Sequence, residues 1–141
     1  MPIAEPKRIV IDTSIAISAA ILPNSISNRA FSLALQHFQL VSSDSTLAEL
    51  IEVIYRAKFD KYLTDEMRLE FLTVVAQASE FITIRSVIKD CPDPKDNQFL
   101  ELAIDGEANI ILSGDPHLTD MNPYRNIIII GPKEFVSRFN Q

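Results

Sequence analysis

The stretch Asn109–Leu118, NIILSGDPHL, indicates the fold class of this protein. Its apolar run IIL is followed by Ser-Gly and then by a carboxylate, Asp115. Two further apolar runs are equally short: RIVI directly before Asp12, and IIII at residues 127–130. Continuous apolar runs of this length, without strict alternation with polar residues, are typical of strands that are covered on both faces of a parallel sheet.

Segments with helical patterning separate these runs. The expected strands are residues 8–12, 38–41, 81–84, 110–113 and 127–130, and the expected helices are residues 13–22, 28–37, 45–58, 64–78, 94–107 and 132–139. Strands that alternate with helices predict an α/β protein, here a three-layer α/β/α sandwich around a central, mainly parallel five-stranded sheet. The 141-residue chain shows no repeat or linker, so residues 1–141 are expected to form a single domain.

The composition predicts a soluble globular protein, because 47% of the residues are hydrophobic and 23% are charged. No apolar run approaches the roughly 20 residues that span a bilayer, so no membrane association is expected. Glu5, Lys7 and Arg8 interrupt the start of the chain, which therefore lacks the apolar core of a signal peptide. Cys91 is the single cysteine and cannot form an internal disulfide. A reducing, cytoplasmic location is expected, with Cys91 as a small packed side chain.

Two carboxylates directly follow expected strands. Asp12 ends the first run, and Asp115 comes shortly after the run at residues 110–112. In open α/β sheets, ligands bind outside the carboxyl ends of the strands, so both acids are expected at one binding edge. The alternative interpretation is that each Asp only caps the helix that follows it.

A third acid lies in the segment DPKDN, residues 93–97. Asp93 before Pro94 is a good helix start, with Asp93 as the N-cap. Asp96 shares a helical face with Leu100 and Ala103, so its side chain is expected to point inward at the leading end of the helix. An inward carboxylate needs a partner, a proton or a metal ion, whereas a purely capping role would only place it near the positive end of the helix dipole.

Glu49 is less clear from the residues alone. Thr46 and Glu49 match the S/T-x-x-E capping pattern at the expected start of a helix. Helical periodicity places Glu49 opposite the apolar stripe of this helix, near Glu52, which favours a solvated position. The side chain would line a cleft only if the helix leans over the sheet edge.

Acids that converge without a His/Cys set favour hard divalent cations, Mg²⁺ or Mn²⁺. Two such ions can activate water and stabilise the leaving oxygen in phosphodiester cleavage. The net charge of −6 and the pI of about 4.8 argue against broad binding of nucleic-acid phosphates, unless the acids gather around cations.

Taken in order, the motifs DTS at residues 12–14, LAEL at residues 47–50, DPKDN at residues 93–97 and SGD at residues 113–115 resemble the PIN (PilT N-terminus) domain family. The resemblance extends to the closing IGPKEF at residues 130–135. It is strongest to the branch that contains the toxin components of prokaryotic toxin–antitoxin systems, the VapC-like ribonucleases.

The resemblance implies a metal-dependent endoribonuclease that uses Mg²⁺ or Mn²⁺ to cut RNA. Its catalytic and metal-binding acids would be Asp12, Glu49, Asp96 and Asp115, which selects Glu49 over Glu52. Accessory positions would be Asp93, Asn97, Ser113, Thr13 and Ser14. The family also implies a homodimer and a small antitoxin protein as partner. Possible RNA contacts that could flank the cleft are Arg8, Lys95, His117 and Arg125, with His117 expected to be a polar loop residue rather than a ligand.

Other classes fit the sequence less well. A haloacid-dehalogenase-like phosphatase usually has a second Asp two residues after its nucleophile, and that position here is Ser14. A receiver domain would need its acids in a different chain order. A catalytically silent PIN-like module that only binds a partner is disfavoured by the presence of all four acids.

Overall fold

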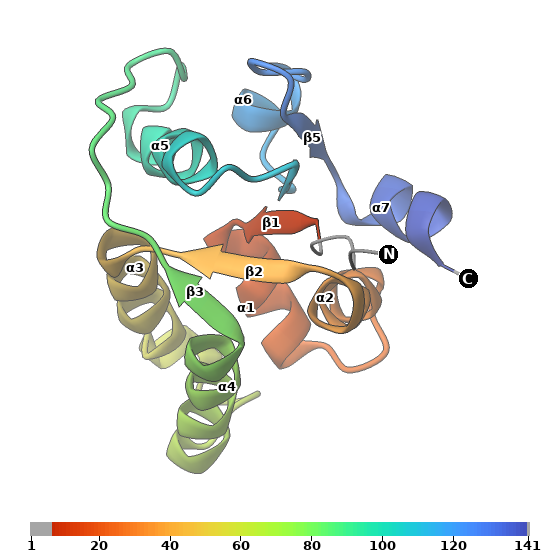
Figure 1. Ribbon diagram of the computed structural model, residues 1–141. Coiled ribbons are helices and arrows are strands. Elements are labelled where there is room, and N and C mark those ends of the chain that lie inside the picture. Colours follow the sequence, from red (N-terminus) through yellow and green to blue (C-terminus); the bar gives the residue numbers. More distant parts are fainter. Residues whose placement is uncertain (1–6, 141) are drawn as a thin grey trace, which may run out of the picture.

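The computed structural model describes residues 7–140 and contains a five-stranded parallel sheet (Figure 1). The strands are β1 Arg8–Ile11, β2 Gln39–Ser42, β3 Ser79–Phe81, β4 Ile110–Leu112 and β5 Ile128–Ile130, in the order β3-β2-β1-β4-β5. The helices are α1 Thr13–Ile21, α2 Ile26–His37, α3 Asp44–Ile54, α4 Asp65–Ala78, α5 Asn97–Asp105, α6 Pro116–Thr119 and α7 Pro132–Phe139, with 3₁₀ turns at Ala57–Phe59 and Pro94–Asp96. The predicted three-layer α/β/α fold is confirmed. Most of the start of the chain, for which no signal peptide is expected, lies outside the described residues.

Alternate residues of the buried strands serve two separate hydrophobic cores. Ile9 of β1 and Ile110 of β4 face the core under α1, α2, α3, α4 and α7, while Val10 and Ile111 face the core under α5 and α6. All four side chains are buried. This two-sided burial explains why these strands are apolar throughout. No helix within residues 7–140 combines the length and apolar character that crossing a bilayer requires.

The strand order creates a switch point between β1 and β4. The chain passes from β1 to β2 and β3 on one side, and then crosses to β4 and β5 on the other side. The crevice at the carboxyl ends of β1 and β4 is where open α/β sheets bind ligands. Asp12 directly follows β1, and its backbone N–H still donates to Leu112 O at 3.0 Å.

The start of α3 differs from the prediction. The N-cap is Ser43 rather than Thr46, because the helix begins immediately after β2. Ser43 Oγ accepts from Thr46 N–H at 3.2 Å, and Thr46 Oγ1 accepts from Ser43 N–H at 3.0 Å. Thr46 is therefore already inside the first turn, and Glu49 takes no part in the cap. The helix also ends earlier than residue 58, at Ile54.

The strand expected at residues 81–84 shares only Phe81 with β3, Ser79–Phe81, so both predicted ends are wrong. The chain then leaves the sheet as an extended segment that two carboxylates of α5 hold in place. Asp105 accepts from the N–H groups of Arg85 and Ser86 at 2.7 and 2.9 Å, and Glu101 accepts from Ile88 N–H at 3.0 Å. These bonds replace strand pairing, so apolar patterning alone did not locate the end of β3.

Candidate active site

Asp12, Glu49, Asp96 and Asp115 line one open pocket of about 280 Å³ at the carboxyl edge of the sheet. They come from the end of β1, from α3, from the turn before α5 and from the segment after β4. The other lining residues are Thr13, Ser14, Lys95, Phe99, Gly114 and Pro116. The topology thus brings together side chains that are widely separated in the sequence.

Asp12 is both a helix cap and part of the pocket. Its Oδ1 accepts from Ile15 N–H at 2.9 Å and from Ser14 Oγ at 3.0 Å, so it caps α1. Its Oδ2 accepts from the hydroxyl of Ser113. Burial raises the pKa of the Asp12 carboxyl above its usual value, although these hydrogen bonds act in the opposite direction.

Ser113 connects the two acids at the strand ends. It is fully buried, and its hydroxyl donates to Asp12 while it accepts from Asp115 N–H at 3.0 Å. Asp115 in turn caps the short helix α6 by accepting from His117 N–H at 2.9 Å. One hydroxyl therefore fixes the relative positions of the ends of β1 and β4.

Asp96 is the most constrained acid of the pocket. It is 4% exposed, and its Oδ2 is buried without a hydrogen-bond donor among the described residues. Burial raises the pKa of Asp96 to about 7, and the neighbouring Asp115 adds to the shift. The same contact lowers the pKa of Asp115. Without a cation, these pKa values favour a protonated Asp96 beside an ionised Asp115 below about pH 7.

Asp96 belongs to a group of four potential metal ligands. Asp93, Asp96, Asp115 and His117 each offer one ligand atom, and these atoms lie within 4.8 Å of one another. Asp93 precedes Pro94 as expected, but its side chain makes no capping hydrogen bond. Instead its Oδ2 lies 3.6 Å from Lys95 Nζ. The predicted N-cap position of Asp93 is confirmed, but its carboxylate lies near the other acids instead of bonding to the first turn.

His117 lies in the short helix α6, where its imidazole contacts the carboxylate of Asp115. Its Nδ1 is 3.4 Å from Asp115 Oδ1, while the side chain remains exposed. Asp12 and Glu49 line the same pocket but stand outside the group of four.

Glu49 faces the pocket rather than the solvent. Its Oε2 accepts from Thr13 Oγ1 at 2.9 Å and from Gln98 Nε2 at 3.0 Å. The solvated position that periodicity favoured is wrong, because α3 packs against both α1 and α5 and its polar face meets them. Gln98, which holds Glu49 in place, was not predicted from the sequence; the only signal was its place in the first turn of the helix that follows Asp96.

Asn97 holds the loop that carries the acids. Its Oδ1 accepts from Cys91 N–H at 2.9 Å, and its Nδ2 donates to Pro94 O at 3.3 Å. Cys91 is buried, and its thiol lies 3.8 Å from His117 O. Burial raises the pKa of the Cys91 thiol, which agrees with a packed side chain. Asn97 therefore supports the pocket without lining it.

Of the basic side chains expected beside the cleft, Lys95 lines the pocket, whereas Arg8 and Arg125 do not. Lys95 lines the pocket, with Nζ 3.5 Å from Asp96 Oδ1. Arg8 begins β1 at the amino edge of the sheet, where it pairs with Glu80 at 2.7 Å, so its expected position beside the cleft is wrong. Arg125 pairs with Asp90 at 3.4 Å in the connection between α6 and β5.

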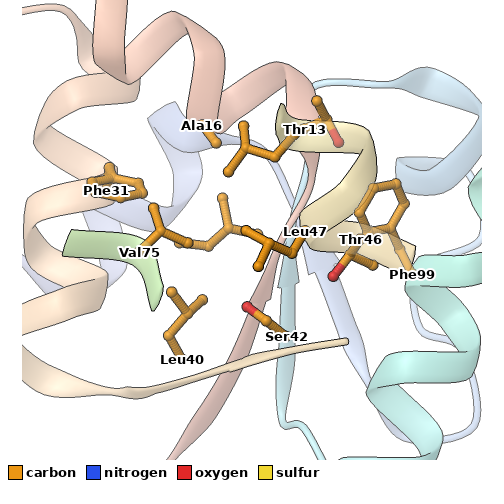
Figure 2. A pocket seen from close by; sticks show the side chains of 11 residues that line it. Thr13, Ala16, Phe31, Leu40, Ser42, Thr46, Leu47, Val75 and Phe99 are labelled. Carbon is orange, nitrogen blue, oxygen red and sulfur yellow. The ribbon is translucent and has the colours of Figure 1, made fainter. Parts of the chain in front are cut away.

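A second, smaller cavity of about 30 Å³ adjoins the acidic pocket; Figure 2 shows the side chains that line it. Thr13 and Phe99 line both spaces. The cavity is surrounded mainly by apolar side chains, including Phe31, Leu40 and Val75. This cavity is a gap in the core packing, whereas the four acids line the open pocket.

The donor set of the open pocket fits a hard divalent cation. Four carboxylates line the pocket, and the buried Oδ2 of Asp96 receives no hydrogen bond from the described residues. Mg²⁺ and Mn²⁺ favour oxygen ligands of this kind, and a cation would remove the need for a proton on Asp96.

The fold and the pocket define the class: a parallel α/β protein with acids gathered at the switch point of its sheet. Residues 8–117 match the sequence model of the PIN domain. The chain therefore belongs to the PIN domain family, as its motifs predicted.

The chain is also similar to two other proteins. An uncharacterized protein from Methanocaldococcus jannaschii is 34% identical over 145 residues, which cover 95% of this chain and 92% of that protein. The fold resembles a chain in the crystal structure of VapBC2 from Rickettsia felis bound to a DNA fragment from their promoter, with a TM-score of 0.57 and 15% identity over 88% of this chain and 98% of that chain. At this identity the likeness concerns the fold.

Proposed function

We propose that this protein is an endoribonuclease that depends on Mg²⁺ or Mn²⁺ and hydrolyses phosphodiester bonds of RNA. The observation that supports it best is the buried, donorless Oδ2 of Asp96 beside the carboxylate of Asp115. Such a pair is costly in a protein that is only a scaffold, because buried carboxylates need a proton or a cation. Membership of the PIN domain family supports the same chemistry.

Asp96 and Asp115 would hold the cation, with Asp93 and His117 close enough to add ligands. Asp12 and Glu49 would complete the acidic wall of the same pocket. Divalent cations bound there would supply an activated water and charge stabilisation on the phosphate oxygens. Thr13 and Gln98 keep Glu49 oriented into the pocket through their hydrogen bonds. Lys95 stands at the pocket with an exposed ammonium that can contact a phosphate of the substrate.

We further propose that the protein is the toxin of a toxin–antitoxin pair, acts as a homodimer in the cytoplasm and is neutralised by a small antitoxin. The resemblance to the toxin branch of the family and the fold shared with a chain of VapBC2 support this assignment. A small reading frame for a DNA-binding protein beside the gene, whose product co-purifies with this chain, is the expected finding.

Cleavage of a labelled single-stranded RNA tests the nuclease proposal. Wild-type protein should cut the RNA with Mg²⁺ or Mn²⁺ and stop in EDTA. Asp96→Asn and Asp12→Asn should lose activity at least roughly 100-fold, because Asn is nearly isosteric but lacks the charge that holds a hard cation. Asn also remains a good N-cap, so Asp12→Asn should keep α1 intact. Glu49→Gln should also be severely impaired.

Glu52→Gln is the matched control, because Glu52 is exposed one turn from Glu49 and its one ion pair among residues 7–140 is with Arg56. Activity that resists EDTA, or full activity in both Asn variants, would refute the metal-nuclease proposal. Turnover of a phosphomonoester but not of RNA would favour the phosphatase class. That class is further disfavoured because Ser14 donates to Asp12 at the position of the second Asp.

A further inference from the structure

The connection between α3 and α4 differs in character from the rest of this acidic chain. Residues 55–62 read YRAKFDKY and contain three basic residues and one acid, whereas the whole chain has 13 basic and 19 acidic residues. Three aromatic side chains are interleaved with the basic ones. We refer to residues 55–62 as the basic aromatic turn.

The cations of this turn and its two tyrosine rings face the solvent, whereas Phe59 packs partly against the core. Tyr55 and Tyr62 are 45% and 43% exposed. Lys58 and Lys61 are exposed and make no ion pair with any described residue. Each ammonium instead lies 5.2 Å from the ring centre of its neighbour, Phe59 or Tyr62. These charges are therefore available to a ligand.

A buried arginine of α4 holds the turn in shape. Arg68 is 3% exposed and donates to Ile54 O at 2.6 Å and to Leu63 O at 3.1 Å, on either side of the turn. It also pairs with Asp60 at 2.9 Å, which neutralises the one acid of the turn. Its guanidinium lies 5.5 Å from the centre of the Tyr55 ring. The exposed rings and ammonium groups thus project from a prearranged backbone, which lowers the entropy cost of binding.

The turn continues the surface of α3 that leads away from the acidic pocket. Glu49, Glu52 and Arg56 are spaced by three and four residues, so they follow one side of the helix, and Glu52 pairs with Arg56 at 2.8 Å. Tyr55 follows Glu49 by six residues, which is about 9 Å of helical rise. In Figure 1, α3 runs from the carboxyl end of β2 towards the connection with α4.

We propose that the basic aromatic turn binds single-stranded RNA that extends along α3 from the acidic pocket, an inference that rests on the proposed nuclease function. Lys58 and Lys61 would contact phosphates, and the exposed face of Tyr62 would stack on a base. Interleaved cations and rings match the alternating phosphates and bases of a single strand. An acidic peptide would use the ammonium groups but not the rings. The turn also explains how a chain with a net charge of −6 attracts a polyanion.

The test measures binding of a short fluorescent oligouridine to the full chain in EDTA, by anisotropy at several salt concentrations. Lys58→Gln/Lys61→Gln should weaken binding and flatten the plot of log affinity against log salt by roughly 1.4, about 0.7 for each phosphate that a lysine no longer neutralises. Tyr62→Ala should weaken binding about tenfold with little change in slope. Tyr62→Phe should retain affinity, because the stacking ring remains.

The matched control is Lys7→Gln/Lys133→Gln, which removes the same charge from two exposed lysines at the start of the described chain and in α7. The control should bind RNA like the wild type. An equal loss in the control, or no loss in the turn variants, would overturn the proposal. So would an oligoglutamate peptide whose binding depends on Lys58 and Lys61 while RNA binding does not; that result would indicate an acidic protein partner.

Failure of this inference is separable from failure of the proposed function. Metal-dependent RNA cleavage with turn variants that bind and cut like the wild type would refute only the binding surface. RNA binding that depends on the turn, without cleavage under any metal condition, would refute the nuclease proposal and leave the surface standing. Circular dichroism of each variant checks that the fold is unchanged.

Discussion

Asp96 is the acid of the candidate site that has a buried carboxylate oxygen without a hydrogen-bond partner among the described residues. It is inward-facing because it shares a helical face with the buried residues Leu100 and Ala103. Its Oδ2 has no donor among the described residues, and its nearest charged neighbour of the same sign is Asp115. The protein can resolve this arrangement with a proton or with a cation, and the two solutions depend differently on pH.

Stability without metal should therefore fall as the pH rises from about 4 to about 7. The pKa of Asp96 is raised from 3.8 to about 7 in the folded protein. Across this interval the folded state holds a proton that the unfolded state releases, so the free energy of unfolding decreases with pH. The raised pKa of Asp12 acts in the same direction. Urea unfolding in EDTA at about pH 5 and about pH 7.5 measures the effect.

Asp96→Asn should reduce this pH dependence, because the titrating group is gone, and Mn²⁺ should reduce it in the wild type by replacing the proton. Glu52→Gln is expected to behave like the wild type. Equal stability of the metal-free wild type at both pH values would show that the Asp96 carboxyl does not carry the proton.

At the scale of elements, α3 contributes one face to the hydrophobic core and another to the acidic pocket. Leu50 and Ile54 on its apolar face join the hydrophobic core, and its contacts with α1 and α5 turn Glu49 into the pocket. Its carboxyl end is secured by Arg68, which reaches across from α4 to Ile54 O. The connection that follows depends on this one buried side chain.

Arg68→Met should lower the free energy of unfolding by about 2–4 kcal/mol, because it leaves the carbonyls of Ile54 and Leu63 without donors. Arg68→Lys should recover little of this, since an ammonium cannot reproduce the planar set of guanidinium donors. Chemical denaturation gives the values.

Arg138→Met is the comparison, because Arg138 forms an exposed i,i+4 pair with Glu134 at 2.9 Å. Its loss should cost less than about 0.5 kcal/mol. Similar costs at the two positions would mean that Arg68 does not organise the turn.

At the scale of the whole molecule, the strand order assembles the pocket. The acids belong to four separate segments, and only the placement of β4 beside β1 joins the ends that carry Asp12 and Asp115. The unfolded chain has no comparable site. A cation that binds the assembled pocket must consequently stabilise the fold.

Millimolar Mn²⁺ should raise the Tm of the wild type by several degrees, as expected for a ligand that binds only the folded state. Asp96→Asn and Asp115→Asn should lose most of this shift, whereas Glu52→Gln should keep it. Thermal melts with and without Mn²⁺ provide the comparison. The same shift in all four proteins would place cation binding elsewhere on the surface.

The sequence by itself determined the sheet, its parallel character and the acids at its carboxyl edge. Strands such as β1 and β4 are buried on both faces, so their residues are apolar without alternation and can be located from composition alone. Strand ends in such sheets meet at one edge, which placed Asp12 and Asp115 together. The inward direction of Asp96 followed from helical spacing. All of these features depend on local periodicity or on a general rule of topology.

Tertiary structure alone decided the position of Glu49, the direction of the Asp93 carboxylate and both ends of β3. Glu49 is oriented by Thr13 and Gln98, which lie 36 and 49 positions away in the sequence. The segment after β3 is held by carboxylates of α5 rather than by a neighbouring strand. Periodicity reports which face of an element is apolar, but it does not report which distant element meets the polar face. That contact depends on how the helices pack over the finished sheet.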